Sequence, residues 1–244
     1  MISRRWLLRI VAGLVLVTAL VRLGMWQLDR NEERAARNAA IEANAARDPV
    51  PVGAMLQVDR QAPADVEWTP VRATGRYDAD QQLVVRFRPL DGQPGRHVLT
   101  PLVTQTGAAL LVDRGFVPQD AEVPAPPDGE VEVVARVRLS EEGRGSGGDP
   151  VSGEIRYVDV DEIAAALRYP VYGAWAELVT QQPPASSSLR PPPAPALDAG
   201  PHLAYAVQWF LFACIAVAGF VFLARAESRL RAEPRPATVT PVRR

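Results

Sequence analysis

The chain is poor in the residues that build metal sites and disulfides. Its 244 residues include a single cysteine, Cys214, and two histidines, His97 and His202. One cysteine cannot form a disulfide within the chain, and so few thiols and imidazoles exclude a zinc site of the usual spacing. Lysine is absent as well, so all 27 basic residues are arginine. We interpret that bias as compositional.

Residue patterns typical of enzyme active sites are equally scarce. His97 stands in GRHVLTP, at the start of an expected strand, and is interpreted as a half-exposed strand residue. The three serines at 186–188 fall in a proline-rich stretch where no rigid base could orient a nucleophile. Asp159 and Asp161 fit the capped N-terminus of a short helix. We therefore expect that the protein is not an enzyme.

Charge is distributed unevenly along the chain. The net charge is only -1, but residues 27–202 carry 26 acidic residues against 17 arginines, whereas the two ends together carry ten arginines against two acids. An acidic middle argues against binding of nucleic acid, because a basic face is needed to neutralise phosphates. The basic ends instead suggest a membrane topology.

Two apolar runs predict membrane-spanning helices. Leu203 to Ala224 has no formal charge over 22 residues and would rise about 33 Å as a helix, which matches the hydrocarbon thickness of a bilayer. Trp6 to Trp26 is the second candidate, with Arg9 and Arg22 near its ends, where long side chains can reach the headgroups. A cleaved signal peptide is the alternative for this run, but no small-x-small cleavage pattern follows it.

Arginines outside the two runs predict the orientation. They precede the first run and follow the second, so the positive-inside tendency places both termini in the cytoplasm and the central region outside it. We expect a multi-pass protein of the plasma membrane, in contact with the lipid bilayer through both helices. The flanking arginines are Arg4, Arg5, Arg9, Arg225, Arg229, Arg231, Arg235, Arg243 and Arg244.

The region between the spans predicts a β-rich domain. QLDRNEERAARNAAIEANAARD extends the first helix to about Ala46, with Glu33 and Arg37 spaced for an ion pair. Short valine-rich and aromatic-rich segments follow, separated by glycine and proline turns, and without helices between them they indicate an antiparallel sheet or small barrel. VDEIAAALRYP predicts one short helix. The expected fold class is therefore an α+β membrane protein in which two transmembrane helices flank an extracytoplasmic, mainly antiparallel β domain.

The chain accordingly divides into seven parts. In order they are a cytoplasmic N-terminus, a transmembrane helix, a helical extension, the β-rich domain, a proline-rich linker, a second transmembrane helix and a basic cytoplasmic tail. Their expected bounds are 1–5, 6–26, 27–48, 49–181, 182–201, 203–224 and 225–244.

The mouth of the second span carries the main candidate site. On a helix, His202, Tyr205, Ala206 and Trp209 share one face, because separations of three, four and seven residues return to the same side. A neutral imidazole there could ligate a haem iron, with Tyr205 and Trp209 flanking the macrocycle and Arg22 pairing with its propionates. An interfacial aromatic belt with a histidine is the competing interpretation.

Four stretches add a family resemblance. LGMWQLDR at 23–30, RPLDGQPGRHVLTPL at 88–102, LLVDRGFVP at 110–118 and HLAYAVQWF at 202–210, in this order and with the two spans, resemble the Surfeit locus protein 1 family. The resemblance implies an accessory protein that helps to assemble cytochrome c oxidase by acting on its haem-copper subunit, and in some bacterial members binds haem a. Gly200 and Pro201 stand where the family often has polar residues, and Gln208 stands where a small hydroxyl residue is common.

The resemblance implies a function and partners. The leading hypothesis is an assembly factor that delivers haem a to subunit I of a haem-copper oxidase, with His202 as the axial ligand and possible contact with haem a synthase. The alternative is a membrane-anchored scaffold that binds oxidase subunits without any cofactor. Within the motifs, Gly24 is expected to allow close helix approach, and Asp113 and Arg114 are expected to form an ion pair.

Overall fold

The computed structural model of the chain describes residues 4–141 and 147–232, so the outermost parts of the expected N-terminus and basic tail lie outside the described residues. It separates into two compact units. The helical unit comprises residues 1–38 and 198–244, and the barrel unit comprises residues 39–197. Each unit is described by itself.

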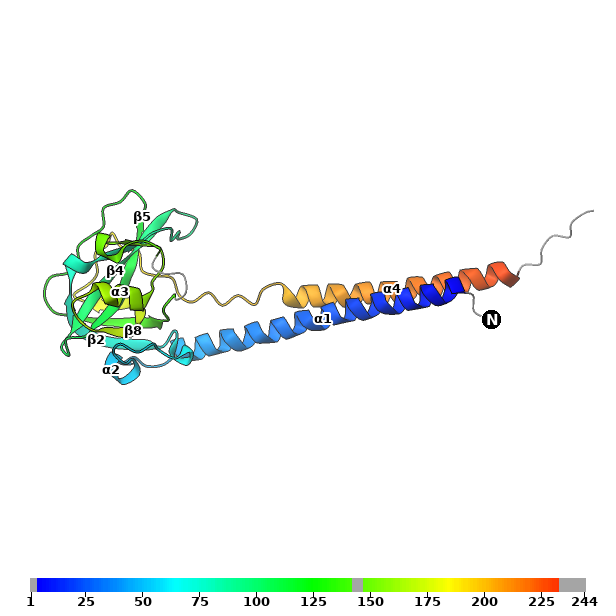
Figure 1. The fold of residues 1–244 in the computed structure, drawn as a ribbon, viewed down its shortest axis with the longest axis horizontal. Helices are drawn as coiled ribbons and strands as arrows, with labels where there is room; N and C mark the ends of the chain where they lie inside the picture. Colours follow the sequence, from blue (N-terminus) through cyan, green and yellow to red (C-terminus); the bar gives the residue numbers. More distant parts are fainter. Residues whose placement is uncertain (1–3, 142–146, 233–244) are drawn as a thin grey trace, which may run out of the picture. The chain divides into compact units, whose positions relative to one another are not determined.

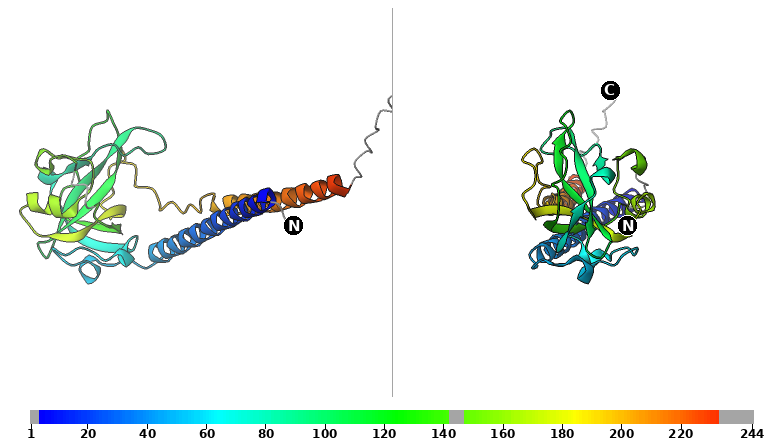
Figure 2. Two further views of the ribbon diagram at one scale, coloured as in Figure 1. Left: turned by 45° about the vertical axis from the view of Figure 1, so that its right-hand side comes forward. Right: turned by 90° about the vertical axis from the view of Figure 1, so that its left-hand side faces the viewer.

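Two long helices form the helical unit. They are α1 (Arg4–Ala45) and α4 (His202–Ala232), and they lie side by side with opposite directions in both sets of views (Figure 1, Figure 2). By length and composition each can cross a membrane, with mean hydropathies of 2.1 and 2.3 over the best 18-residue windows. The two helices therefore support membrane anchoring of the chain.

A seven-residue repeat pairs the two helices. The less exposed residues of α1 are separated alternately by four and three positions, and the same spacing recurs on α4, which is the pattern of left-handed helix packing. These seam residues are Trp6, Ile10, Gly13, Val17, Leu20, Gly24 and Gln27 on α1, and His202, Ala206, Trp209, Ala213, Ala216 and Phe220 on α4.

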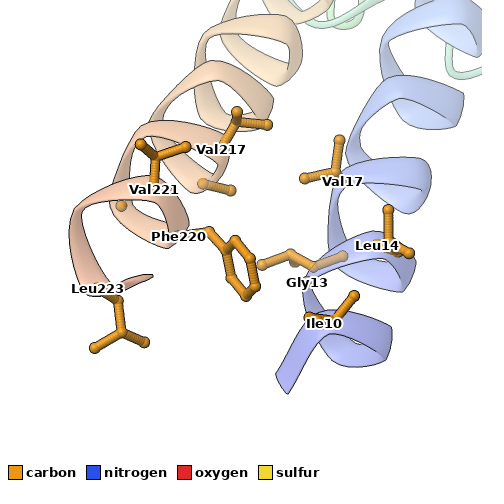
Figure 3. Close-up of a pocket in the computed structure, with 11 residues that line it drawn as sticks. Ile10, Gly13, Leu14, Val17, Val217, Phe220, Val221 and Leu223 are labelled. Carbon is orange, nitrogen blue, oxygen red and sulfur yellow. The ribbon is translucent and has the colours of Figure 1, made fainter. Parts of the chain in front are cut away.

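Small residues set how closely the helices approach. Gly24 is buried, and a Cβ added there would lie 2.7 Å from the ring of Phe210. Gly13 faces Phe220 in the same way, beside an apolar groove of about 420 Å³ (Figure 3). Without side chains on these glycines, aromatic rings of α4 can pack against the backbone of α1. The close approach expected at Gly24 is confirmed.

Five strands of the barrel unit close into a ring in the order β2, β6, β8, β5 and β4, with β4 pairing back to β2. The pairs are antiparallel except for β5 with β8, which is parallel. The curved strands of the ring can be followed in the two views of Figure 2. The ring is made of β2 (Pro70–Tyr77), β4 (Gly95–Thr104), β5 (Ala109–Pro118), β6 (Val131–Arg138) and β8 (Val171–Gln182).

Shorter elements cover the ring. Strand β3 extends the sheet beyond β4, β7 pairs in parallel with β3, and β1 pairs in parallel with β2. The short helix expected near residue 160 is present as α3, where the Asp159 side chain accepts a hydrogen bond from the Glu162 N–H. The bounds are β1 (Val50–Pro51), α2 (Val52–Met55), η1 (Ala64–Val66), η2 (Ala79–Gln81), β3 (Leu83–Val85), η3 (Pro150–Ser152), β7 (Glu154–Ile155) and α3 (Val160–Ala166).

Side-chain alternation produces two apolar cores. In β8, Ala174, Ala176 and Leu178 face the barrel interior, whereas Val171 and Trp175 face a second core. Residues of β3, β7 and α3 close that second core over β4, β5 and β8. Because both faces of the central strands are covered, β5 is buried from Ala109 to Val117.

The structure differs from the expected β domain and linker in two places. The segment VYGAWAELVTQQ, which we did not expect as a strand, forms the longest one, β8. It is buried on both faces and carries small residues inside the barrel, so its sequence lacks the alternation of a half-buried strand. In addition, the start of the proline-rich segment packs on the barrel, where Leu189 is buried and Arg190 exchanges backbone hydrogen bonds of 2.8 and 3.0 Å with Phe116.

Candidate functional site

His202 is the first residue of α4, and the chain turns sharply just before it. Gly200 has φ +67°, a left-handed conformation that glycine adopts without strain. The Asp198 carboxylate accepts a hydrogen bond of 2.7 Å from the Gly200 N–H, and the Pro201 carbonyl accepts the first helical bond from the Tyr205 N–H. This turn fixes where the imidazole enters the helix.

The imidazole of His202 is oriented by α1. Its Nδ1 lies 2.8 Å from Oε1 of Gln27. Because an amide oxygen can only accept, Nδ1 is the donor in this contact, and in the neutral form of the imidazole Nε2 then keeps a free electron pair. A Cβ built on Gly200 would lie 3.3 Å from Nε2. The absence of a side chain at Gly200 therefore leaves room beside this edge of the ring.

A hollow of about 440 Å³ adjoins His202. Its wall is one face of α1, where the arginines are three, four and seven residues apart and so project in similar directions. Arg30 pairs with Glu33 at 2.7 Å, and its guanidinium stacks 5.8 Å from the centre of the Trp26 ring. The hollow is lined by Trp26, Arg30, Glu33, Arg34, Arg37 and His202.

The structure brings only some of the expected site residues together. His202 and Trp209 both lie on the seam, and the Trp209 ring meets Phe212 edge to face at 6.0 Å. Tyr205 is 48% exposed and lies off the seam. Arg22 is exposed and is not among the residues that line the hollow beside His202.

Gln27 and the arginines of the helical extension were missed by sequence reasoning. The spacing of Arg30, Arg34 and Arg37 is visible in the sequence and places them on one face. Their closeness to His202 is not visible, because it depends on the register of two antiparallel helices separated by more than 150 residues of sequence; His202 and Gln27 are 175 positions apart.

A second polar cluster lies in the barrel unit, outside the ring, around a cavity of about 100 Å³. Nδ1 of His97 is 2.6 Å from Oδ2 of Asp113, whose other oxygen accepts from the Gly115 N–H at 2.9 Å. His97 lies in strand β4, as expected, but its side chain is only 14% exposed because β3 and the segment after it cover this end of β4. The remaining polar wall is made of Arg88, Arg138, Glu141 and Glu177.

Two carboxylates in this cluster have opposite pKa shifts. Burial would raise the pKa of Glu141, but hydrogen bonds from Arg88 and from the Val158 N–H, with the charge of Arg88, outweigh it and lower that pKa. Burial raises the pKa of Glu177; the charge of Arg138 opposes this shift and the charge of Asp113 adds to it. In this cluster Glu141 is thus paired with Arg88, and Glu177 is paired with Arg138.

Asp113 and Arg114 do not form the expected ion pair, because neighbouring residues of a strand point to opposite faces. Asp113 binds His97, as described. The buried Arg114 donates to the Gln82 side chain at 2.8 Å and to the carbonyls of Pro124 and Ala125 at 3.1 and 3.0 Å. Burial lowers the pKa of Arg114. Two of its acceptors tie β5 to the loop that follows it, and Gln82 ties β5 to the residue before β3.

Neither site has the composition of a metal centre made from protein ligands alone. Among residues 4–141 and 147–232, no group of three or more histidine, cysteine, aspartate or glutamate side chains could hold a metal ion.

These features define a class of protein: a membrane-anchored chain in which two paired apolar helices accompany a small closed barrel. The SURF1 family model matches residues 14–214, which include the barrel, His202 and most of both helices' apolar parts. The chain belongs to the SURF1 family, and the resemblance found in its sequence motifs is confirmed.

Relatives from distant organisms share this similarity. A SURF1-like protein of Mycobacterium tuberculosis is 33% identical over 229 residues, which cover 90% of this chain and 83% of the relative. Surfeit locus protein 1 of Xenopus tropicalis is 30% identical over 158 residues, 56% of this chain and 48% of the relative. The human Surfeit locus protein 1 is 30% identical over 140 residues, 49% of this chain and 45% of the relative.

Proposed function

We propose that this protein is an assembly factor for cytochrome c oxidase that helps to deliver or insert haem a into subunit I. Members of the SURF1 family are linked to assembly of this oxidase. The proposal extends that role to this chain and adds the cofactor, with subunit I as the acceptor and haem a synthase as a possible donor. The protein acts by binding and transfer and carries out no turnover of its own.

The observation that carries the haem proposal is the orientation of His202. Its Nδ1–H is held by Gln27 at 2.8 Å, so Nε2 is left with a free electron pair on the side where Gly200 has no side chain. In histidines that ligate metal, a hydrogen bond from the ring nitrogen that does not bind the metal fixes the tautomer and the direction of the ring. Haem a, when bound, would supply an iron that accepts Nε2 as an axial ligand.

The surrounding residues support the same proposal. Trp26 and Trp209 place aromatic surface on both helices near His202, and the hollow of about 440 Å³ beside it is lined by arginines. Aromatic rings offer apolar area to a porphyrin, and guanidinium groups pair with carboxylates. Tyr205 lies off the seam and Arg22 is not among the residues that line the hollow, and in this proposal both contact the lipid interface.

The proposed topology places this site at the outer surface of the membrane. Arg4, Arg5 and Arg9 stand at one end of α1, and Arg225 and Arg229 stand at the adjacent end of α4, where Arg9 pairs with Glu227 at 2.8 Å. The positive-inside tendency assigns this basic end to the cytoplasm. His202, at the other end of α4, then faces the extracytoplasmic side of the plasma membrane, as does the barrel unit.

The experiment is purification of the full chain in mild detergent from a host that makes haem a. We expect a haem spectrum for the wild type, loss of the low-spin signal in His202→Ala, and a weakened or shifted signal in Gln27→Ala, in which Nδ1 loses its acceptor. Tyr205→Ala is the matched control on the same helix turn. An unpigmented protein that still copurifies with subunit I would contradict haem delivery and favour the scaffold alternative.

A further inference from the structure

The arginine face of α1 beside His202 has a charge excess that the fold does not use. Arg30 is neutralised by Glu33 at 2.7 Å. Glu33 pairs with Arg30 in place of the expected partner, Arg37. Among the described residues, no carboxylate lies within 4.0 Å of Arg34 or Arg37. Two guanidinium groups therefore remain available for an anionic partner.

The position of these arginines is tied to the imidazole. Gln27 holds His202, and Arg30 and Arg34 lie about one and about two helical turns beyond Gln27, at a rise of about 1.5 Å per residue. The Arg34 Cδ would lie 3.7 Å from a Cβ on Gly200, the same Cβ that would lie 3.3 Å from Nε2 of His202. The aliphatic stem of Arg34 thus borders the open side of the ring, with its charged end farther out.

We infer that Arg34 and Arg37, supported by Arg30, bind the carboxylates of a macrocycle whose metal is ligated by His202. This inference rests on the proposed haem function and names the residues that recognise the ligand's charge. Arginine is suited to the role because its planar fork pairs with a carboxylate through two parallel hydrogen bonds. The inference replaces Arg22, the propionate partner expected from the sequence, by a face about two to four turns farther along the same helix.

An anionic lipid headgroup is the other source of an oxyanion at this position. The hollow begins at Trp26, an aromatic residue of the kind found at membrane interfaces, so headgroup phosphates could reach Arg30 or Arg34. The two sources differ in one respect. Recognition of a macrocycle couples the arginines to His202, whereas recognition of a headgroup is independent of the imidazole.

The test measures how far binding depends on the ligand's carboxylates. Full-length protein in zwitterionic nanodiscs is titrated with iron protoporphyrin IX and with its dimethyl ester, in which both carboxylates are neutral, and the Soret band reports binding. For the wild type we expect the diacid to bind about tenfold or more tightly than the diester, since hydrogen bonds to charged groups contribute about 1.5–3 kcal/mol. In the double variant Arg34→Gln/Arg37→Gln this preference should disappear.

Two further variants separate the explanations. Arg225→Gln removes one charge from the opposite end of the helical unit and should keep the preference. Arg22→Gln tests the rival position, and a preference lost there but kept in the double variant would overturn the inference. Far-UV circular dichroism checks the helices of each variant, whose altered side chains are all exposed.

The remaining outcomes are also decisive. If the wild type binds both porphyrins equally through His202, the carboxylate site is wrong while the proposed haem function stands. If the protein shifts the Soret band of neither porphyrin, and the spectra with His202→Ala are the same as with the wild type, the proposed haem function fails as well. Anionic nanodiscs test the lipid explanation. If anionic lipid abolishes the preference for the diacid in the wild type, and binds His202→Ala equally well, the arginine face is a lipid site and the inference is overturned.

Discussion

Replacement of Asp113 by alanine should destabilise the barrel unit strongly, because this carboxylate satisfies two buried donors. Its side chain is 5% exposed and accepts from His97 at 2.6 Å and from the Gly115 N–H at 2.9 Å. A buried donor left without an acceptor costs about 1–3 kcal/mol. Relief of the repulsion between Asp113 and Glu177 offsets part of the loss.

The sum is a fall of about 3 kcal/mol in the free energy of unfolding for Asp113→Ala. Asp113→Asn keeps an acceptor oxygen of the same shape, so it should lose less. Glu154→Ala is the matched control, since the Glu154 side chain is 50% exposed and pairs with Arg86 at 3.3 Å, and exposed pairs contribute about 0–1 kcal/mol.

The assay is urea unfolding of the full chain in mild detergent, followed by tryptophan fluorescence. Trp175 lines the same cavity as Asp113, so its emission reports on this region of the barrel unit. A change for Asp113→Ala no larger than that for Glu154→Ala would refute the reasoning. The pair with His97 would then make no net contribution to stability.

Three further predictions follow from the same contacts. The lowered pKa of Glu141 means that its contribution to stability is present above the ordinary value of 4.5 and is lost as pH falls through the lower folded value; acid titrations of unfolding should be flatter in Glu141→Gln. Gly24→Val should weaken helix pairing by about 1–3 kcal/mol in SDS unfolding monitored by circular dichroism, because even a Cβ at this position would lie 2.7 Å from the Phe210 ring. Gly219→Val is its control and should leave helix pairing unchanged, because a Cβ there would have no neighbour within 4 Å. Arg138→Ala leaves the buried Glu177 without its 2.6 Å partner and should cost about 3–5 kcal/mol in the fluorescence assay.

The elements that depend on local pattern were predicted well. The two apolar runs, the short helix at Val160–Ala166 and six of the strands follow from periodicity, turn residues and capping. The DG turn before β4 is an example, with Asp91 and Gly92 both at positive φ between Leu90 and Gln93, as this hairpin turn requires.

The features that depend on packing between distant segments were not predictable. The burial of β8 on both faces removes the alternation that marks a strand, and its parallel pairing with β5 depends on the order of strands in the ring. The same limit applies to the candidate site. The face shared by His202 and Trp209 follows from helical spacing, but the partner Gln27 follows only from the register of the two helices.

The structure also explains how Gly200, which stands where the family often has a polar residue, fits beside His202. In the sequence, a glycine in place of a polar residue only raised the question of local geometry. In the structure Gly200 has φ +67°, and a Cβ there would lie 3.3 Å from Nε2 of His202. A side chain at this position would be strained and would approach the imidazole, so Gly200 is compatible with the proposed ligand role.

The most direct test of the account is the haem a content of the oxidase in a strain that lacks this gene, measured from the reduced-minus-oxidised spectrum of its membranes. The account predicts a reduced haem a signal per subunit I, restored by the wild-type gene and not by His202→Ala. A haem a signal that is unchanged by the deletion would contradict it.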